Sequence, residues 1–242
     1  MMHDTVKIAL ASKPFINGDT AANLQTMLDT MAEAAQSGAE LVCFSEAFLQ
    51  GFDGLNWQWE TDRDIALSWQ DAPILRLREA SCALGVDVAF GYIEREGETL
   101  YSAYMVIQQG EVLHNFRRVS RGWKDYTRTD AHYCEGEAPA LFEYHGKKFA
   151  IALCGDLFDQ RERFCLGADV LLWPIYRDCP LEAWASGETE EYARQCKGVA
   201  PLTCVINAIC PPEGFGGCWL FEQGKTKAQL VPGNEGLLLV EV

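Results

Sequence analysis

The apolar run LVCFSE at residues 41–46 limits the fold of this chain more than any other segment. It has the length of a strand but not the polar alternation of a half-exposed one, which is typical of a strand covered on both faces. Two later apolar runs, FAIALC at 149–154 and DVLLWP at 169–174, are also predicted as strands. Helical patterns lie between these runs. The sequence therefore predicts an α/β protein with helices outside its sheets.

Further strands are predicted at 6–12, 86–92, 101–107, 111–116, 203–209, 218–222, 228–231 and 236–242. Helices are predicted from a cap at Asp19–Thr20 to Gly38, with an apolar stripe of Leu24, Leu28, Met31 and Ala35, and at 72–84, 158–166 and 187–198. The tight links EREGE and IQQGE favour antiparallel hairpins, so the sheets are expected to be mixed. Because no low-complexity linker divides the chain, residues 1–242 are assigned to one domain.

Two segments of the chain resemble each other. SGAELVCFSEAF (37–48) and LGADVLLWPIYR (166–177) share a glycine, a small residue, an acid, an apolar strand and polar residues after it. Gly38 and Gly167 are expected to end helices with positive φ. Such a repeat is what two similar halves, stacked sheet to sheet, would leave in a sequence.

Composition narrows the functional classes. The net charge of −15 disfavours nucleic acid and anionic membranes as partners, and the longest apolar runs are too short to span a bilayer. The ten cysteines include no CxxC pair, and the four histidines show no ligand spacing, so no metal site is expected. No secretory signal is recognised at the start of the chain. These features predict a reduced, cytoplasmic protein.

Two polar residues close strongly apolar strands: Glu46 ends LVCFSE and Cys154 ends FAIALC. Ligand sites of α/β proteins gather at such strand ends. A carboxylate can take the proton of a thiol and pass it to a leaving amine. Gly155 allows close approach of the backbone, whose N–H can face a developing oxyanion. Asp156 is expected to cap the next helix. Taken alone, however, most buried cysteines are inert, and an acid like Glu46 is more often a surface residue or part of a strand-end salt bridge.

Several motifs, in order, resemble the nitrilase or carbon–nitrogen hydrolase superfamily over nearly the whole chain. They are VKIALASKPFINGDTAANL, GAELVCFSEAFLQGF, YSAYMVIQQGEVLHNFRR, IALCGDLF, GADVLLWP and EYARQCKGVAPLTCVINAI. The resemblance implies a four-layer αββα sandwich with two mixed β-sheets. It also implies a Glu–Lys–Cys site without metal or organic cofactor, with the glutamate at Glu46 and the nucleophile at Cys154. Through a thioester, such a site hydrolyses a small-molecule amide or nitrile.

The chain departs from the family at the lysine position, which carries Arg118. Arginine can stabilise an oxyanion, but it does not release a proton at neutral pH. Lys124 is the alternative cation, if its loop folds back into the site. A second family glutamate is replaced by Thr129, with Asp130 beside it.

Three functions remain open from the sequence. The first is a divergent amidase that uses Glu46, Cys154 and either Arg118 or Lys124. The second is a nitrilase-fold pseudoenzyme that binds a small ligand or a protein partner without turnover. The third is a thiol redox protein that pairs Cys154 with a neighbour such as Cys134. The expected substrate contacts are Gly155, Phe52, Tyr176 and Asp130, and the family's usual subunit contact implies a homodimer with 236–242 near its interface.

Overall fold

A computed structural model of the chain describes residues 5–242. One sheet contains β1 (Lys7–Ser12), β2 (Leu41–Cys43), β3 (Asp87–Glu96), β4 (Thr99–Gln108), β5 (Glu111–Arg117) and β14 (Gly236–Glu241). The other contains β6 (Phe142–Tyr144), β7 (Lys147–Ile151), β8 (Val170–Ile175), β9 (Leu202–Asn207), β12 (Cys218–Glu222) and β13 (Lys225–Leu230). A short ribbon pairs β10 (Ile209–Cys210) with β11 (Gly214–Phe215).

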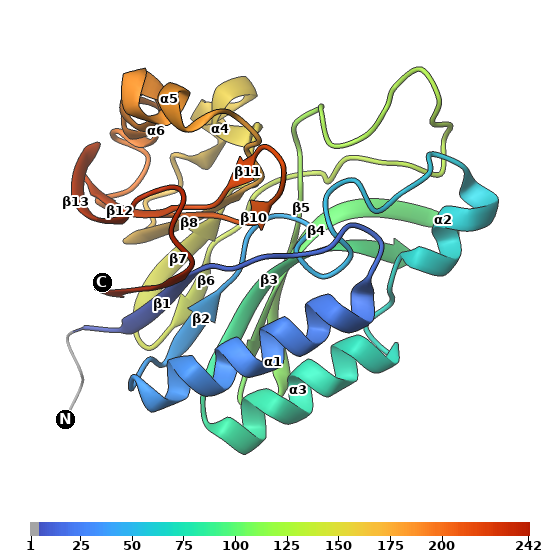
Figure 1. The fold of residues 1–242 in the computed structure, drawn as a ribbon, viewed down its shortest axis with the longest axis horizontal. Coiled ribbons are helices and arrows are strands. Elements are labelled where there is room, and N and C mark those ends of the chain that lie inside the picture. The colour runs from blue at the N-terminus through green and yellow to red at the C-terminus, as the bar shows by residue number, and fades with distance from the viewer. Residues whose placement is uncertain (1–4) are drawn as a thin grey trace.

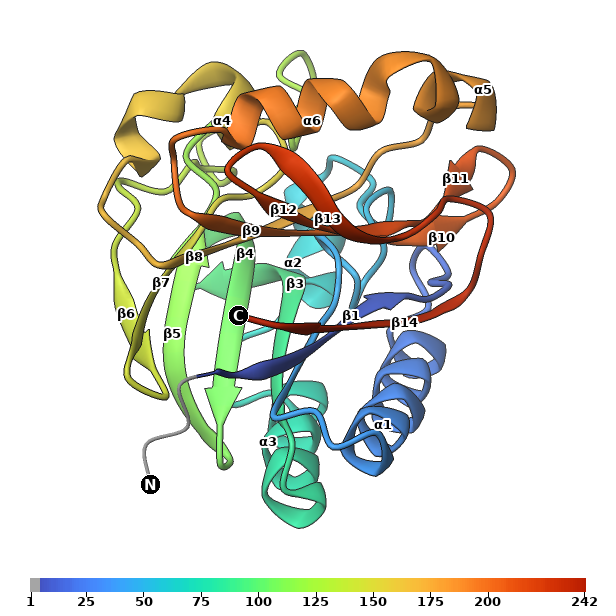
Figure 2. The same ribbon diagram turned by 90° about the vertical axis from the view of Figure 1, so that its left-hand side faces the viewer.

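The helices are α1 (Thr20–Gln36), α2 (Trp59–Ile65), α3 (Ala72–Leu84), α4 (Asp156–Asp159), α5 (Leu181–Ala183) and α6 (Thr189–Cys196). A 3-10 turn at Arg161–Phe164 follows α4, and a π-helical turn at Trp184–Glu188 joins α5 to α6. Figures 1 and 2 show α1 and α3 over one sheet and α4, α5 and α6 over the other. The layer order helix, sheet, sheet, helix confirms the expected four-layer sandwich.

The two sheets share one pattern of strand directions. The first runs β5–β4–β3–β2–β1–β14 and the second β13–β12–β9–β8–β7–β6. In both, two antiparallel pairings are followed by two parallel pairings and a final antiparallel one. Gly38 and Gly167, which precede the equivalent strands β2 and β8, both have positive φ, at 72° and 76°. The repeat seen in the sequence thus marks equivalent places in the two halves.

Packing between the layers buries the apolar faces of the sheets. The largest hydrophobic cluster joins the inner faces of both, with Leu10 and Tyr104 from the first sheet and Ile151 and Val205 from the second. A second cluster lies between the first sheet and α1 with α3. Within residues 5–242 the structure has no helix long and apolar enough to cross a membrane.

Several expected elements differ in detail. Strand β2 ends at Cys43 rather than at residue 46, and the strand expected at 203–209 is divided between β9 and β10. The helix expected at 158–166 is instead α4 and a 3-10 turn, because Gln160 leaves the helical region at φ −141°. The fully buried residues of α1 are Asn23, Met27, Thr30, Met31 and Ala34, so its buried face lies one position from the expected stripe.

Candidate active site

Glu46 and Cys154 each lie just beyond the end of a strand, one from each sheet. Glu46 lies three residues after β2, and Cys154 lies three residues after β7. Close packing holds the Glu46 segment against β3, since a Cβ atom added at Gly91 would stand 2.3 Å from the Ala47 nitrogen. The Cys154 nitrogen donates to the Pro174 carbonyl at 3.0 Å, which extends the pairing of β7 with β8. Strand pairing therefore fixes the backbone at both positions.

The Glu46 carboxylate is completely buried, and its two oxygens differ in their contacts. Oε1 accepts hydrogen bonds from Arg118 Nη1 at 2.9 Å and from Ser102 Oγ at 3.2 Å. Oε2 has no hydrogen-bond partner. A buried carboxylate oxygen without a donor is costly, so Oε2 is open to a hydrogen-bond donor that enters the site.

Arg118 brings its guanidinium to Glu46 from the end of β5. The two side chains are 3% and 0% exposed, so their ion pair is shielded from water. Burial by itself works to lower the pKa of Arg118, but the charges of Glu46, Cys154 and Asp156 raise it above its ordinary value. The guanidinium therefore remains a fixed positive charge in the site.

The Cys154 thiol is half-buried between these groups, and its Sγ lies 3.7 Å from the Tyr176 carbonyl oxygen. Its backbone has a φ of 42°, and its carbonyl accepts a hydrogen bond from Trp173 Nε1 at 2.9 Å. Burial raises the pKa of the thiol to about 12, the Glu46 carboxylate adds to the rise, and Arg118 opposes it. At neutral pH the resting sulfur thus carries its proton, and a neighbouring base must remove it before the sulfur can attack.

Two serines complete the arrangement around Glu46 and Arg118. Ser102 on β4 donates to Glu46, and the Ser120 hydroxyl accepts from Arg118 Nε at 2.9 Å. Both serines are buried, at 2% and 0% exposed. Sequence reasoning did not select them, because single serines in apolar strands and loops carry no distinctive pattern. The signal available for Ser120 was its position two residues after the unusual arginine.

Lys124, Thr129 and Asp130 bind residues of their own loop rather than Glu46 or Arg118. The Lys124 ammonium donates to the Tyr133 carbonyl and lies 3.4 Å from Glu135. The Thr129 hydroxyl donates to the Asp125 carbonyl at 2.7 Å.

Asp130 is exposed and bonds His132, whose backbone amide is the main cause of the lowered pKa of this carboxyl. The structure thus brings Glu46, Arg118 and Cys154 together and keeps Lys124 with Glu135.

The expected substrate contacts differ in where they lie. The Phe52 and Tyr176 rings stack with their centroids 4.8 Å apart. The backbone carbonyl of Tyr176 also faces the Cys154 sulfur, so this stack lies close to the thiol. Gly155 adjoins the guanidinium instead, because a Cβ atom at this position would stand 2.6 Å from Arg118 Nη2.

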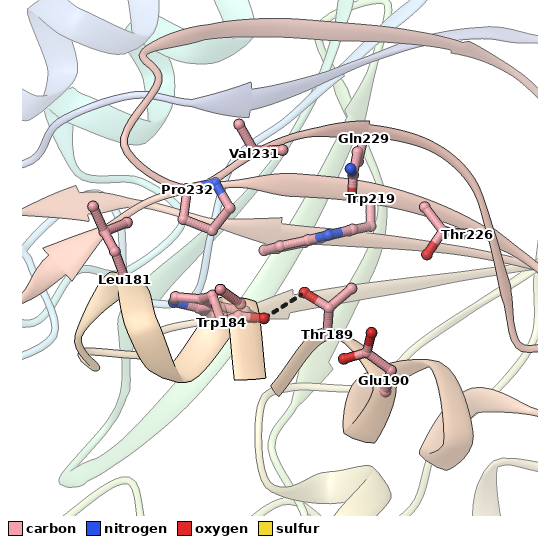
Figure 3. Close-up of a pocket in the computed structure, with 10 residues that line it drawn as sticks. Leu181, Trp184, Thr189, Glu190, Trp219, Thr226, Gln229, Val231 and Pro232 are labelled. Atoms are coloured by element: carbon pink, nitrogen blue, oxygen red, sulfur yellow. Dashed lines mark hydrogen bonds between the residues drawn. The ribbon is translucent and has the colours of Figure 1, made fainter. Parts of the chain in front are cut away.

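A separate pocket of about 510 Å³ lies between the α5–α6 segment and strands β12 and β13 (Figure 3). Trp184 and Trp219 stack at its floor with centroids 4.8 Å apart. None of the candidate site residues lines it. Among residues 5–242, no three His, Cys, Asp or Glu side chains are placed to hold a metal ion together.

Solved structures share this fold. A mutant of the Nesterenkonia AN1 amidase, from the nitrilase superfamily, superposes with a TM-score of 0.82 at 20% identity, covering 98% of this chain and 90% of that one. At this identity the likeness concerns the fold. It agrees with the two stacked mixed sheets described above.

Curated relatives are similar over about half of the chain. The bromoxynil-specific nitrilase of Klebsiella pneumoniae subsp. ozaenae is 31% identical over 126 residues, which are 48% of this chain and 36% of that protein. Nitrilase 3 of Arabidopsis thaliana is 30% identical over 130 residues, which are 48% of this chain and 38% of that protein. The matched region thus spans little more than a third of these relatives. The model of the carbon–nitrogen hydrolase family matches residues 7–174, which include Glu46, Arg118 and Cys154, and the chain belongs to this family within the nitrilase superfamily.

Proposed function

We propose that this protein hydrolyses small amides through a thioester on Cys154. Glu46 acts as the general base and acid, and Arg118 is the stabilising cation. The observation that carries the proposal is the asymmetry of the Glu46 carboxylate. One oxygen is held by Arg118 and Ser102, while the other is buried without a partner in the cluster that contains the thiol.

The reaction follows from these contacts. Glu46 Oε2 takes the proton of the Cys154 thiol as the sulfur attacks the amide carbon. The tetrahedral intermediate collapses when the protonated Glu46 returns this proton to the leaving amine. A water molecule, deprotonated by Glu46, then attacks the thioester carbon. The carbon–sulfur bond breaks, the thiol regains its proton, and the products are a carboxylic acid and ammonia or an amine.

Arg118 favours amides over nitriles as substrates. Attack on an amide produces an oxyanion, which a fixed guanidinium can stabilise throughout the step. Attack on a nitrile produces a nitrogen that must be protonated, and an arginine does not supply that proton at neutral pH. A lysine in this place could do so more readily. We therefore assign the amide class, with the Phe52–Tyr176 stack as one wall of the pocket.

One solved relative supports a cysteine in this role. A mutant of the Nesterenkonia amidase shows covalent addition of the acetamide moiety of fluoroacetamide at its active-site cysteine. That protein shares the fold of this chain.

The direct test is ammonia release from a series of aliphatic amides and the matching nitriles. We expect turnover of amides, its abolition by Cys154→Ala, and a fall of about a thousandfold or more with Glu46→Gln, since general acid–base catalysis contributes about 10²–10⁴-fold. Cys204→Ala is the matched control, because Cys204 is a buried thiol on β9. Amide hydrolysis that survives Cys154→Ala would overturn the proposal.

Intact-mass labelling tests the nucleophile without knowledge of the substrate. Iodoacetamide and iodoacetate have similar size, but only the latter is an anion. A site with Glu46 beside the thiol should label Cys154 much faster with the neutral amide, and Glu46→Gln should reduce this preference. Slow labelling spread over several cysteines, together with no turnover, would support a binding protein without catalysis.

We also propose a homodimer that uses the β14 edge, where the Leu239 side chain is 40% exposed on the last strand of its sheet. A reducing, cytoplasmic setting suits the ten cysteines, all of which are free thiols. Sedimentation velocity at micromolar concentration should give a dimer that Leu239→Glu weakens. A monomer for the unaltered protein would exclude this assembly.

A further inference from the structure

The Arg118 guanidinium is held on three sides. Nη1 donates to Glu46 Oε1 at 2.9 Å, Nε donates to the Ser120 hydroxyl at 2.9 Å, and Nη2 donates to the Arg121 carbonyl at 2.8 Å. The Glu46 contact joins the reacting groups, but the other two come from the loop that follows Arg118. This loop therefore determines the plane and direction of the guanidinium.

The loop is fastened to the turn that carries the nucleophile. Asp156, completely buried, accepts hydrogen bonds from the Ser120 nitrogen at 2.7 Å and the Val119 nitrogen at 3.2 Å through one oxygen. Its other oxygen accepts from the Leu153 nitrogen at 2.8 Å. One carboxylate thus joins the backbone on either side of the site, and it keeps Ser120 at a fixed distance from Cys154.

Gly155, the residue after Cys154, has no side chain, and the Arg118 guanidinium occupies the space that a side chain would fill. A Cβ atom at Gly155 would stand 2.6 Å from Arg118 Nη2 and 3.3 Å from Ser120 Oγ. The φ of Gly155 is −63°, a value that any residue adopts, so the backbone conformation does not require glycine here. The need for glycine comes from contact with the guanidinium.

We infer that Ser120 is a positioning residue for Arg118, and that Ser120, Gly155 and the Arg121 carbonyl form a cradle matched to a guanidinium. This inference rests on the proposed function. The arginine is then a working replacement for a lysine, and the surrounding residues are adapted to its shape.

A lysine does not fit this cradle equally well. An ammonium group could still bond Glu46, but a lysine has no Nε–H to meet Ser120 and no planar fork to reach Arg121 at the same time. The Ser120 hydroxyl, which is completely buried, would lose its donor at a desolvation cost, and the Arg121 carbonyl would lose its contact with the guanidinium. Exchange at Arg118 alone should therefore lower activity.

The test compares Ser120→Ala and Ser120→Thr with Ser12→Ala in the full-length protein. Ser12 is the matched control, because it is also completely buried and its hydroxyl makes two backbone hydrogen bonds, to Asn234 and from Gly217. Two readouts are used: kcat and KM for an amide that the enzyme turns over, and the rate of Cys154 alkylation by iodoacetamide from pH 7 to 9.

With Ser120→Ala we expect kcat to fall roughly tenfold while KM changes little, because a hydrogen bond to a charged group is lost and the substrate is not touched. Alkylation should slow by a similar factor at every pH, since a displaced guanidinium stabilises the thiolate less. Ser120→Thr should restore both rates, and Ser12→Ala should leave both unchanged. Ser120→Ala with unaltered kcat and alkylation would overturn the inference, as would an equal loss in Ser12→Ala.

A second experiment tests the shape of the cradle. In Arg118→Ala, millimolar guanidinium should restore alkylation of Cys154, whereas methylammonium at the same concentration should not. Equal restoration by both cations would contradict a cradle built for guanidinium. The alkylation readout also separates the two proposals: a protein that turns over no amide fails the proposed function, yet its alkylation rates still decide whether Ser120 positions Arg118.

Discussion

At the scale of single residues, the fold holds Cys154 in an unusual backbone conformation. Its φ of 42° is unusual for a residue with a side chain, and its backbone is held at both ends by Pro174 and Trp173. Strained backbone of this kind persists where the surrounding structure determines it, often at reactive sites. Since burial raises the pKa of the thiol, the proposed attack requires Glu46 as the base rather than a preformed thiolate.

Gly155→Ala should separate backbone strain from contact with Arg118. The φ of −63° suits alanine, so the protein should fold, but the new methyl group would displace Nη2. We expect kcat to fall by roughly tenfold or more, because small displacements of catalytic groups cost large factors in rate. Kinetics of Gly155→Ala, Arg118→Lys and the double variant test this. The narrower lysine should lessen the added effect of the methyl group, and strictly multiplicative losses would argue against direct contact.

The sequence predicted part of this site at residue level. The resemblance pointed to Glu46, Cys154 and either Arg118 or Lys124, and in the structure Arg118 lies with Glu46 and Cys154. Lys124 could not be located, because its position depends on Tyr133 and Glu135 in an irregular loop. Asp156 begins α4 as expected, but its carboxylate does not cap that helix. Its carboxylate binds amides 36 and 37 residues earlier in the chain, a contact that no local pattern reveals.

At the scale of elements, prediction succeeded where hydrophobic periodicity was long and failed where tertiary contacts decide. The hairpins of β3, β4 and β5 and the helices α1 and α3 follow the sequence closely. Helix α2 was not predicted, since it is short and Asp62 fixes it through bonds from the Asn56 nitrogen and the Tyr133 hydroxyl. The π-helical turn at Trp184–Glu188 has no sequence signature, because a glycine such as Gly187 is equally compatible with any irregular segment.

Asp19→Ala should destabilise the protein without affecting catalysis. The Asp19 carboxylate accepts from the Ala22 nitrogen at 2.9 Å and so caps α1, on the outer face of the first sheet. Loss of such a cap costs about 1 kcal/mol in the free energy of unfolding. Urea denaturation measures the change, with Asp29→Ala in the same helix as the control. A cap variant as stable as the control, or one with altered kcat, would contradict this assignment.

At the scale of the whole molecule, the site depends on the stacking of two similar halves. Glu46 and Arg118 follow strands of the first sheet, and Cys154 follows a strand of the second. Both sheets have the same order of parallel and antiparallel pairings, but β2 and β7, which precede Glu46 and Cys154, are not equivalent strands in that order. The short repeat in the sequence predicted two similar halves, but it did not reveal that β14 and β13 form edges of the two sheets.

Asp156, which joins the two halves, should make stability depend on pH. Burial raises its pKa to about 6 from an ordinary value of 3.8. Between these values the folded state binds more protons at this group than the unfolded state, so the contribution of Asp156 to the free energy of unfolding increases as pH falls from 6 toward 3.8. Above pH 6 both states are ionised, and the burial penalty applies in full.

The measurement is urea denaturation of the unaltered protein and Asp156→Asn at pH 7.5 and pH 5. Relative to Asp156→Asn, the unaltered protein should gain free energy of unfolding when the pH is lowered from 7.5 to 5. The expected gain is about 1–2 kcal/mol, since one pKa unit corresponds to about 1.4 kcal/mol. Asp125→Asn, at an exposed carboxyl on the surface, provides the control. A difference that is independent of pH would show that Asp156 has an ordinary pKa.

The division of the site between two sheets has a consequence for how the protein matures. Until the sheets have docked, the Cys154 sulfur has neither the Glu46 carboxylate nor the Arg118 guanidinium beside it, and it behaves as one ordinary thiol among ten. Under the proposed mechanism, which needs both groups, an incompletely folded chain would not form the thioester. The proposed reactivity would appear together with the completed interior, so the rate at which this cysteine is alkylated would report whether the two sheets have docked.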